Sequence, residues 1–220
     1  MSRQALRRLP LYYRCASRCR EKNQQFVSSE EISREAEVNP VQVRKDLTQL
    51  FGEFGKPGVG YNVQELCLLL EELLGFRGRN EAVLVGAGRL GSAIASYTGF
   101  ARYGLSIVAL FDSDPGKVGA EISGKKVFPM SELQHIVQRL GIRVGIITVP
   151  APEAQGVADA LVRSGIRAIW NFAPVTLSVP PGIVVRNEDL ASGLATLFHH
   201  VAGSCPVRYT QEISPAGRTL

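Results

Sequence analysis

The sequence predicts an α/β protein in which a helical N-terminal part precedes a doubly wound parallel sheet. Residues ~10–75 carry helix-capping residues and helix-type spacing of apolar residues, whereas apolar strands alternate with amphipathic helices from Glu81 onward. The stretch VLVGAGRLGSA at 83–93 adds a third observation, because there an apolar strand is followed by a glycine turn and then by a helix. Together these features predict a Rossmann-like second domain.

The N-terminal end is basic, and the chain lacks membrane signals. The net charge is +5. Within residues 1–22 the single acidic residue is Glu21, whereas the cations are Arg3, Arg7, Arg8, Arg14, Arg18, Arg20 and Lys22. This cluster favours an anionic partner such as a phosphate backbone, although a solvated basic end has the same composition. No apolar run approaches the ~20 residues that span a bilayer, and the start lacks the apolar core of a signal peptide. We therefore expect a cytoplasmic protein with no membrane partner.

The cysteines predict buried thiols rather than a metal site or a disulfide. Cys15, Cys19, Cys67 and Cys205 show no CxxC spacing. Cys15 and Cys19 also share helical spacing with Tyr12 and Ala16, which indicates a buried face. We expect no metal.

Three helices are predicted in the first fifty residues. Pro10 suits the first position of a helix. Ser28 followed by Glu31 forms a capping box before the second helix. Asn39 caps the third helix, and Pro40 takes its first position.

The third helix combines an apolar face with a polar, basic one. Burial is predicted for Val43, Leu47 and Leu50. The opposite face carries the candidate DNA-binding residues Gln42, Arg44, Lys45 and Gln49. Two short helices joined by a tight turn describe a helix-turn-helix, whose second helix enters the major groove of double-stranded DNA. Arg44 and Lys45 can then reach guanine edges or phosphates, and Gln42 can read adenine. A helical unit that binds only another protein is the alternative.

Residues 51–61, FGEFGKPGVGY, predict a wing. Glycines bracket Lys56, which suits a short two-stranded wing with a cationic tip that follows the adjacent minor groove or backbone. The DNA-binding domain then spans residues 1–76, and GFRGRN at 75–80 is the linker.

Residues 77–203 predict the Rossmann domain. Strands are expected near 82–86, 106–111, 144–149, 167–171 and 182–186, with helices near 89–98, 130–140, 152–164 and 188–202. The last helix can pack on its own sheet or on a second subunit. Residues 204–220 have no periodicity and are expected to be a flexible tail.

The glycine turn predicts dinucleotide binding. Gly86, Gly88 and Gly91 match G-x-G-x-x-G, which lets backbone N–H groups and a helix N-terminus approach a pyrophosphate. Asp112 ends the second strand, where a carboxylate binds both hydroxyls of the adenine ribose and repels a 2′-phosphate. This favours NADH and NAD⁺ over the phosphorylated cofactors, although Asp112 can also be a turn-former.

Two later loops, at 147–152 and 170–175, should line the nicotinamide half of the site, since ligands of such sheets bind beyond the carboxyl ends of the strands. The candidate cofactor contacts from the motif and loops are Gly86, Ala87, Gly88, Arg89, Leu90, Gly91, Asp112, Lys117, Thr148, Val149, Pro150, Asn171, Phe172 and Ala173.

No catalytic residue is assigned. Hydride transfer to a substrate usually needs a proton donor or acceptor. His135, His199 and His200 fall on predicted helices rather than on loops at strand ends, although Tyr, Lys or Asp could still serve. Tyr97 completes a helical stripe with Leu90, Ala93 and Ile94, and this pattern predicts a core residue.

From Leu9 to Gly203 the chain resembles the Rex family of redox-sensing transcriptional repressors of bacteria. The resemblance rests on LPLYYR, VSSEEI, QVRKDL, FGEFGKPGVGYNV, GAGRLGSAIA, FDSDPGKVG, ITVPA, NFAPV and VRNEDL in this order. It implies a homodimer of winged-helix and Rossmann domains that represses genes of fermentation and anaerobic respiration. Such a repressor binds palindromic operators when free or NAD⁺-bound and releases them when NADH binds, without a catalytic base.

The resemblance also assigns roles by position. It implies that the helix at 188–202 is exchanged between subunits, that Tyr97 lies near the nicotinamide rather than in the core, and that Asp189 reaches the nicotinamide from the partner subunit. Arg14 would pair with that region in the DNA-bound form. Pro57 departs from the family pattern, in which many members have a cationic or polar wing residue, so minor-groove contact would rest more on Lys56. Cys15 and Cys19 are not a family motif, and leave direct thiol sensing open.

Two other functions remain as alternatives. One is a small NAD-dependent dehydrogenase with an accessory helical domain, and the other is a coenzyme A-binding Rossmann protein. Both leave the first 75 residues without an explanation.

Overall fold

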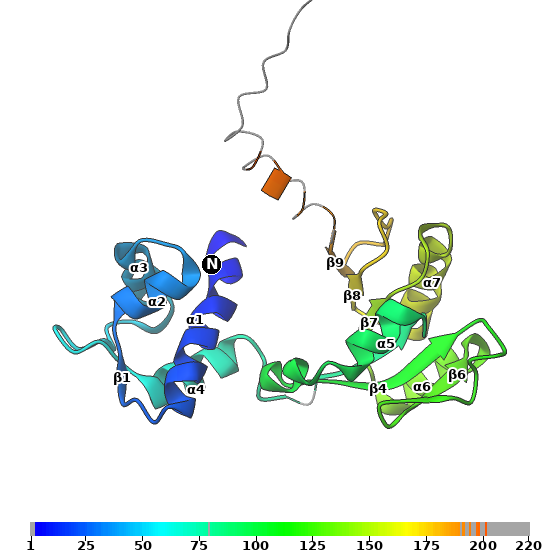
Figure 1. Ribbon diagram of the computed structural model, residues 1–220, viewed down its shortest axis with the longest axis horizontal. Helices are drawn as coiled ribbons and strands as arrows, with labels where there is room; N and C mark the ends of the chain where they lie inside the picture. The colour runs from blue at the N-terminus through cyan, green and yellow to red at the C-terminus, as the bar shows by residue number, and fades with distance from the viewer. Residues whose placement is uncertain are drawn as a thin grey trace, which may run out of the picture. The chain divides into compact units, whose positions relative to one another are not determined.

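The computed structural model describes residues 3–78 and 80–189, together with positions 191, 194, 197, 198 and 201 (Figure 1). The chain forms two compact units. The first contains residues 1–82 and 96–108, and the second contains residues 83–95 and the chain from 109 onward. Across these described residues, no helix combines the length and the apolar character needed to cross a membrane.

The first unit is a small helical domain with a two-stranded sheet. Its elements are α1 (Arg3–Glu21), β1 (Phe26–Val27), α2 (Ser29–Ala36), α3 (Pro40–Phe51), β2 (Tyr61–Asn62), α4 (Val63–Leu73) and the 3₁₀ helix η1 (Thr98–Tyr103). The core is formed by fully buried side chains from all four α-helices, among them Leu9, Tyr12, Ile32, Val43, Leu47, Leu66 and Leu70. Helix α1 packs against both α2 and α4, so it is the central element of this unit.

The predicted caps of α2 and α3 are confirmed. The Ser28 hydroxyl accepts from the N–H of Glu31 at 3.1 Å, and the Glu31 carboxylate accepts from the N–H of Ser28 at 2.9 Å. The Asn39 side chain accepts from the N–H of Val41 at 2.8 Å, and Pro40 is the first residue of α3. These caps fix where the two helices begin, because they satisfy N–H groups that have no partner within the helix.

The prediction for Pro10 is wrong. Helix α1 already includes Arg3, and Pro10 lies inside it. The buried Ala5 and Leu9 lie before Pro10 on this helix, so tertiary packing outweighs the helix hydrogen bond that proline cannot form.

The wing is smaller than predicted. Lys56 and Gly60 form an isolated antiparallel bridge, and β2 pairs with β1 rather than with a strand of the wing. The tip is therefore Pro57, Gly58 and Val59, and Lys56 lies at the base with its ammonium 5.7 Å from the centre of the Phe26 ring. The prediction of a cationic tip is wrong for this reason.

Three of the cysteines are buried as predicted. Cys15, Cys19 and Cys67 are free thiols in the first unit. Burial raises the pKa of the Cys15 thiol to about 12, which suits an inert core residue. Cys205 lies outside the described residues.

The second unit holds most of a sheet that contains β3 (Asn80–Val85), β4 (Leu105–Asp112), β5 (Glu121–Ile122), β6 (Lys125–Pro129), β7 (Val144–Ile147), β8 (Ala168–Asn171) and β9 (Val184–Asn187). The order is β5-β6-β4-β3-β7-β8-β9, and β5 pairs antiparallel with β6. Without β5, the strands follow the 3-2-1-4-5-6 order of a dinucleotide-binding sheet. Strands β5 and β6 were not predicted, because lysines interrupt this short apolar run.

The helices of this unit are α5 (Arg89–Ser96), α6 (Leu133–Leu140) and α7 (Ala151–Ser164). Helix α5 is two residues shorter than predicted, and residues 130–132 are a 3₁₀ turn rather than the start of α6. Tyr97 follows α5 as the N-cap of η1 and is 61% exposed, so its assignment to the core is wrong. Most of the predicted helix at 188–202 and the whole tail at 204–220 lie outside the described residues.

Candidate functional site

Helix α3 is held in the first unit by a buried carboxylate. Arg8 donates to Asp46 through Nε at 2.7 Å and Nη2 at 2.9 Å, and the Tyr12 hydroxyl donates to the same carboxylate at 2.8 Å. The Gln42 amide adds a fourth hydrogen bond at 2.7 Å. Two of these donors come from α1, so Asp46 fixes the position of α3 on the central helix.

This arrangement favours the ionised carboxylate. Burial alone would raise the pKa of Asp46, but the hydrogen bonds from Arg8, Tyr12 and Gln42 hold it below its usual range. Burial and the neighbouring Asp46 carboxylate raise the pKa of Tyr12, so its hydroxyl remains a donor at neutral pH.

The predicted DNA-binding residues of α3 differ in how available they are. The Gln42 side chain donates to Asp46, and Arg44 donates to the Ser29 hydroxyl at 2.7 Å and lies 3.5 Å from the Glu30 carboxylate. Lys45 and Gln49 are exposed. The outward surface therefore depends most on these last two residues, with Arg44 partly engaged and Gln42 held inward.

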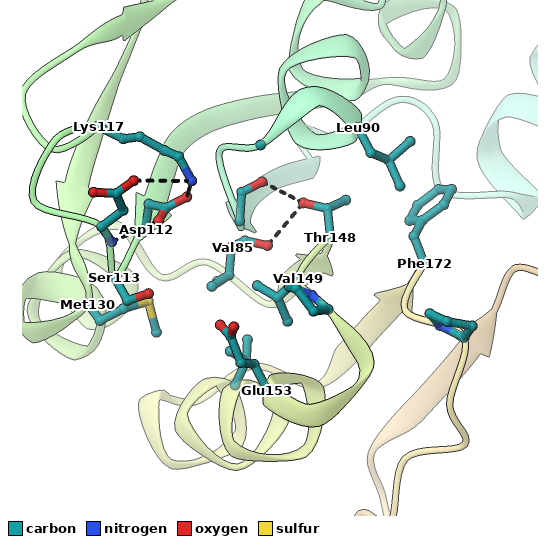
Figure 2. Close-up of a pocket in the computed structure, with 16 residues that line it drawn as sticks. Val85, Leu90, Asp112, Ser113, Lys117, Met130, Thr148, Val149, Glu153 and Phe172 are labelled. Atoms are coloured by element: carbon teal, nitrogen blue, oxygen red, sulfur yellow. Dashed lines mark hydrogen bonds and ion pairs between the residues drawn. The ribbon is translucent and has the colours of Figure 1, made fainter.

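A pocket of about 570 Å³ lies in the second unit, where the strands end (Figure 2). Nine of its lining residues were predicted: Gly86, Gly88, Leu90, Asp112, Lys117, Thr148, Val149, Pro150 and Phe172. Pro174 belongs to the loop at 170–175 that was predicted to line the site, although it was not singled out. Others were missed: Val85, Ser113, Asp114, Met130, Glu153 and Val157. Met130 follows the unpredicted strand β6, and Glu153 stands in the first turn of α7, where an acidic residue is a usual helix-start signal.

The glycine turn is shaped by close backbone approaches. Gly86 has a φ of +103°, and a Cβ there would lie 2.8 Å from the carbonyl carbon of Thr148. A Cβ at Gly91 would collide with the Gly86 carbonyl oxygen, so the helix can pack closely only with glycine. A Cβ at Gly88 would meet nothing within 4 Å, and Gly88 lines the pocket. Gly88 therefore leaves space open beside the start of α5, where a pyrophosphate would bind.

Thr148 ties the glycine turn to the next strand. Its hydroxyl lies 3.0 Å from the carbonyl oxygen of Val85 and 2.8 Å from that of Gly86, and donates to these oxygens (Figure 2). Its backbone N–H donates to Val85 at 2.9 Å. Thr148 thus fixes the turn close to the point where Gly91 of α5 packs on it.

Asp112 forms the charged end of the pocket. Its carboxylate accepts from the N–H of Ala87 at 2.8 Å, the N–H of Asp114 at 2.9 Å and the ammonium of Lys117 at 3.1 Å. Burial alone would raise the pKa of Asp112, but these three donors hold it below its usual range. The carboxylate both supports the glycine turn and keeps acceptor capacity for a further donor such as a ribose hydroxyl.

The other end of the pocket is apolar. In Figure 2 the Phe172 ring faces Leu90, opposite the end that holds Lys117 and Asp112. Asn171 precedes Phe172 and is fully buried, and its amide donates to the carbonyls of Ala173 and Val175 and accepts from the N–H of Ala173. Asn171 and Ala173 therefore shape this loop instead of lining the pocket.

The remaining predicted residues lie elsewhere. Ala87 and Gly91 belong to the turn itself, and Arg89 is exposed at the start of α5. Tyr97 and Arg14 both line a separate depression of about 480 Å³ in the first unit. Arg14 donates to Glu35 at 2.6 Å, and Asp189 accepts from the N–H of Ala191 at 2.9 Å. The predicted contacts of Asp189 with a partner subunit stay predictions.

Two family models match this chain. One is described as a CoA binding domain and matches residues 79–175, and the other is described as a putative DNA-binding protein N-terminus and matches residues 1–48. The first range contains the glycine turn, and the second contains Asp46 together with its donors Arg8 and Tyr12.

Similar proteins are redox-sensing repressors. The redox-sensing transcriptional repressor Rex of Roseiflexus sp. is 44% identical over 90% of this chain and 89% of its own length. Rex 1 of Thermotoga maritima is 43% identical over 89% of this chain and 93% of its own.

Solved structures of a Rex-family repressor are also similar to this chain. RSP, a Rex-family repressor, was crystallised with β-NAD⁺ and operator DNA, and that chain is 37% identical with a TM-score of 0.85 over 93% of this chain and 94% of its own. The same repressor with β-NADH has a TM-score of 0.82 at 35% identity, over 93% of this chain and 95% of its own. With relatives this similar over nearly the whole chain, the protein belongs to the Rex family of redox-sensing transcriptional repressors.

Proposed function

We propose that this protein is a repressor that binds operator DNA through α3 and is released when NADH occupies the pocket at the glycine turn. The observation that carries the proposal is the presence in one chain of two separately built sites. One is a helix held by Asp46 with cationic residues facing outward, and the other is a pocket that suits a dinucleotide. The related RSP complexes, with operator DNA and with NADH, support the same division.

The pocket fits NAD(H) on three counts. Gly88 leaves room for a pyrophosphate at the start of α5, and Asp112 keeps acceptor capacity for the ribose hydroxyls at the charged end. Phe172 and Leu90 give an apolar surface that suits a neutral, reduced nicotinamide ring. The bound nucleotide would supply a redox signal through its two oxidation states.

We infer that the dinucleotide is bound and not turned over. Leu90, Phe172 and Pro174 line the apolar end, and none of these side chains can donate or accept a proton in hydride transfer. The residues of this chain then only bind and orient the nucleotide.

The release of DNA requires a second state of a homodimer. NADH can shift the equilibrium only by the difference between its affinities for the two states. A 100-fold change in operator affinity needs about 2.7 kcal/mol of coupling. In this proposal the partner subunit's C-terminal helix, together with Asp189, Tyr97 and Arg14, takes part in the switch, and the operator is palindromic because the dimer is two-fold symmetric. The protein acts in the cytoplasm, where both NAD⁺ and NADH are available.

The test is a titration of a labelled palindromic duplex, selected for binding from a random library, with NADH against a fixed NAD⁺ background. NADH should release the DNA, and Lys45→Ala should weaken DNA binding while leaving NADH affinity intact. Gly88→Trp should fill the pyrophosphate space, so that the protein binds DNA and no longer responds. Binding of NADH without any change in operator affinity would refute the switch, as would a Gly88→Trp protein that NADH still releases.

Coenzyme A is a second candidate ligand because the match at residues 79–175 is to a CoA binding domain. Coenzyme A and NADH both carry an adenosine diphosphate part, so they would compete for the same glycine turn. Displacement of NADH by equimolar coenzyme A would favour this alternative. Steady loss of NADH absorbance with a carbonyl compound would favour a dehydrogenase.

A further inference from the structure

The recognition helix α3 exposes an apolar side chain that the sequence analysis did not assign. Val41 is the second residue of α3 and is 45% exposed. Its backbone is fixed, because its N–H donates to the Asn39 side chain at 2.8 Å and Pro40 precedes it. A β-branched side chain on a fixed helical backbone has one strongly preferred rotamer, so the two methyl groups of Val41 are held in place.

Val41 shares one face of α3 with the exposed polar residues. The exposed residues Val41, Arg44, Lys45, Thr48 and Gln49 are spaced three or four residues apart, so they form a single face along the helix. Val43 and Leu47 lie on the buried side. Gln42, which sequence reasoning assigned to base reading, instead donates to Asp46. On this face Val41 is the one aliphatic side chain, and polar or cationic residues surround it.

The start of a recognition helix is the part that contacts base edges. In the major groove the only apolar group on a base pair is the C5-methyl of thymine. A cation one turn away, Lys45, is attracted to phosphates or to guanine, which also makes this surface unsuited to an apolar protein partner.

We propose that Val41 reads a thymine by contact with its methyl group, once in each half-site of the operator. This inference rests on the proposed function, since it needs α3 to bind operator DNA. It makes Val41 a specificity-determining residue, whereas Lys45 contributes affinity that depends on salt.

The experiment uses thymine-to-uracil replacement, which removes the methyl group and keeps every hydrogen-bonding atom of the base. The tightest duplex selected from a random library is made with each symmetric pair of thymines replaced in turn. Binding is measured for the full-length wild type, for Val41→Ala and for Leu68→Ala. Leu68 is a matched control, because it is equally exposed at 45% but lies on α4.

For the wild type and for Leu68→Ala, replacement of one symmetric pair of thymines by uracil should weaken binding. Burying one methyl group changes affinity about fourfold, so replacement in both half-sites should weaken binding by roughly 16-fold. Val41→Ala should bind the thymine and uracil duplexes with nearly equal affinity, and the slope of its affinity against salt should match that of the wild type, since no charge has changed. Equal unfolding midpoints for wild type and Val41→Ala would show that the variant is folded.

Each outcome decides the proposal. Wild-type binding that is insensitive to uracil at every position would overturn the inference and leave the repressor function intact. A thymine preference that persists in Val41→Ala would also overturn it, because another residue would then read the methyl group. Failure to select any duplex at all would overturn both this inference and the DNA-binding function on which it rests.

Discussion

Asp46 in the first unit and Asp112 in the second are both buried carboxylates that neutral donors and one cation hold in the ionised form. The donors to Asp46 are side chains, and Arg8 and Tyr12 are 38 and 34 residues away in the sequence. The donors to Asp112 include the backbone N–H groups of Ala87 and Asp114, and Lys117 is only five residues away. One carboxylate fixes the helix that we propose to read DNA, and the other fixes the turn that would bind a nucleotide.

The two carboxylates differ in whether the sequence predicts their roles. Asp112 was assigned from the sequence, because a carboxylate at the end of the strand after a glycine turn has a fixed place in this fold. Asp46 was missed, since no local pattern connects it to Arg8 and Tyr12. A buried carboxylate could thus be recognised from the sequence in the second unit but not in the first. Three measurements test how similar the roles of the two carboxylates are.

The largest effect is expected for Asp46→Ala. Removal of one partner from a buried ion pair leaves the other uncompensated, and with the Arg8 side chain 18% exposed we expect a loss of about 3 kcal/mol in the free energy of unfolding of the first unit. Urea unfolding measures this loss. Asp46→Asn is the control, which keeps the shape and should lose less. NADH affinity should be unchanged, and a loss below about 1 kcal/mol would show that Asp46 does not hold α3.

Asp112→Ala should act on binding more than on folding. The N–H of Ala87 loses its acceptor and the turn loses its fixed geometry, so NADH affinity should fall about thirtyfold, as expected for hydrogen bonds to a charged group. Fluorescence titration with NADH measures this change, and DNA binding without NADH provides the control. Unchanged NADH affinity would contradict the role given to this carboxylate, and a large loss of stability instead would make Asp112 a purely structural group like Asp46.

The smallest effect is expected in the dependence of stability on pH. Both carboxylates have pKa values below their usual range, so each contributes stability that is fully present above the unfolded pKa of about 3.9 and is lost as the pH falls through the folded pKa. The unfolding free energy should therefore show no slope from these groups between pH 7 and 5 and should fall below about pH 4. Asp46→Asn and Asp112→Asn should each make this decrease of the unfolding free energy below pH 4 less steep. If a variant shows the same decrease as the wild type, the carboxylate that it lacks has an ordinary pKa.

Much of the fold followed from local rules. The capping box at Ser28 and the cap at Asn39 were correct, because they depend on residues within three positions of each other. The glycine turn was also correct, since Gly86 needs a positive φ and Gly91 meets the backbone of the same turn. Errors occurred where distant packing decides, as at Pro10, at the base of the wing and at Tyr97.

The sequence by itself determined that this chain combines a helix-turn-helix with a dinucleotide-binding sheet, because periodicity, caps and glycine spacing act over short distances along the chain. Only the tertiary structure decided which side chains of α3 face outward. Asp46 draws Gln42 inward, and Ser29 accepts from Arg44, which stays half-exposed, whereas Val41, Lys45 and Gln49 are exposed. These contacts join residues from separate helices, and helical spacing cannot show which side chains of one face are held by partners on another helix.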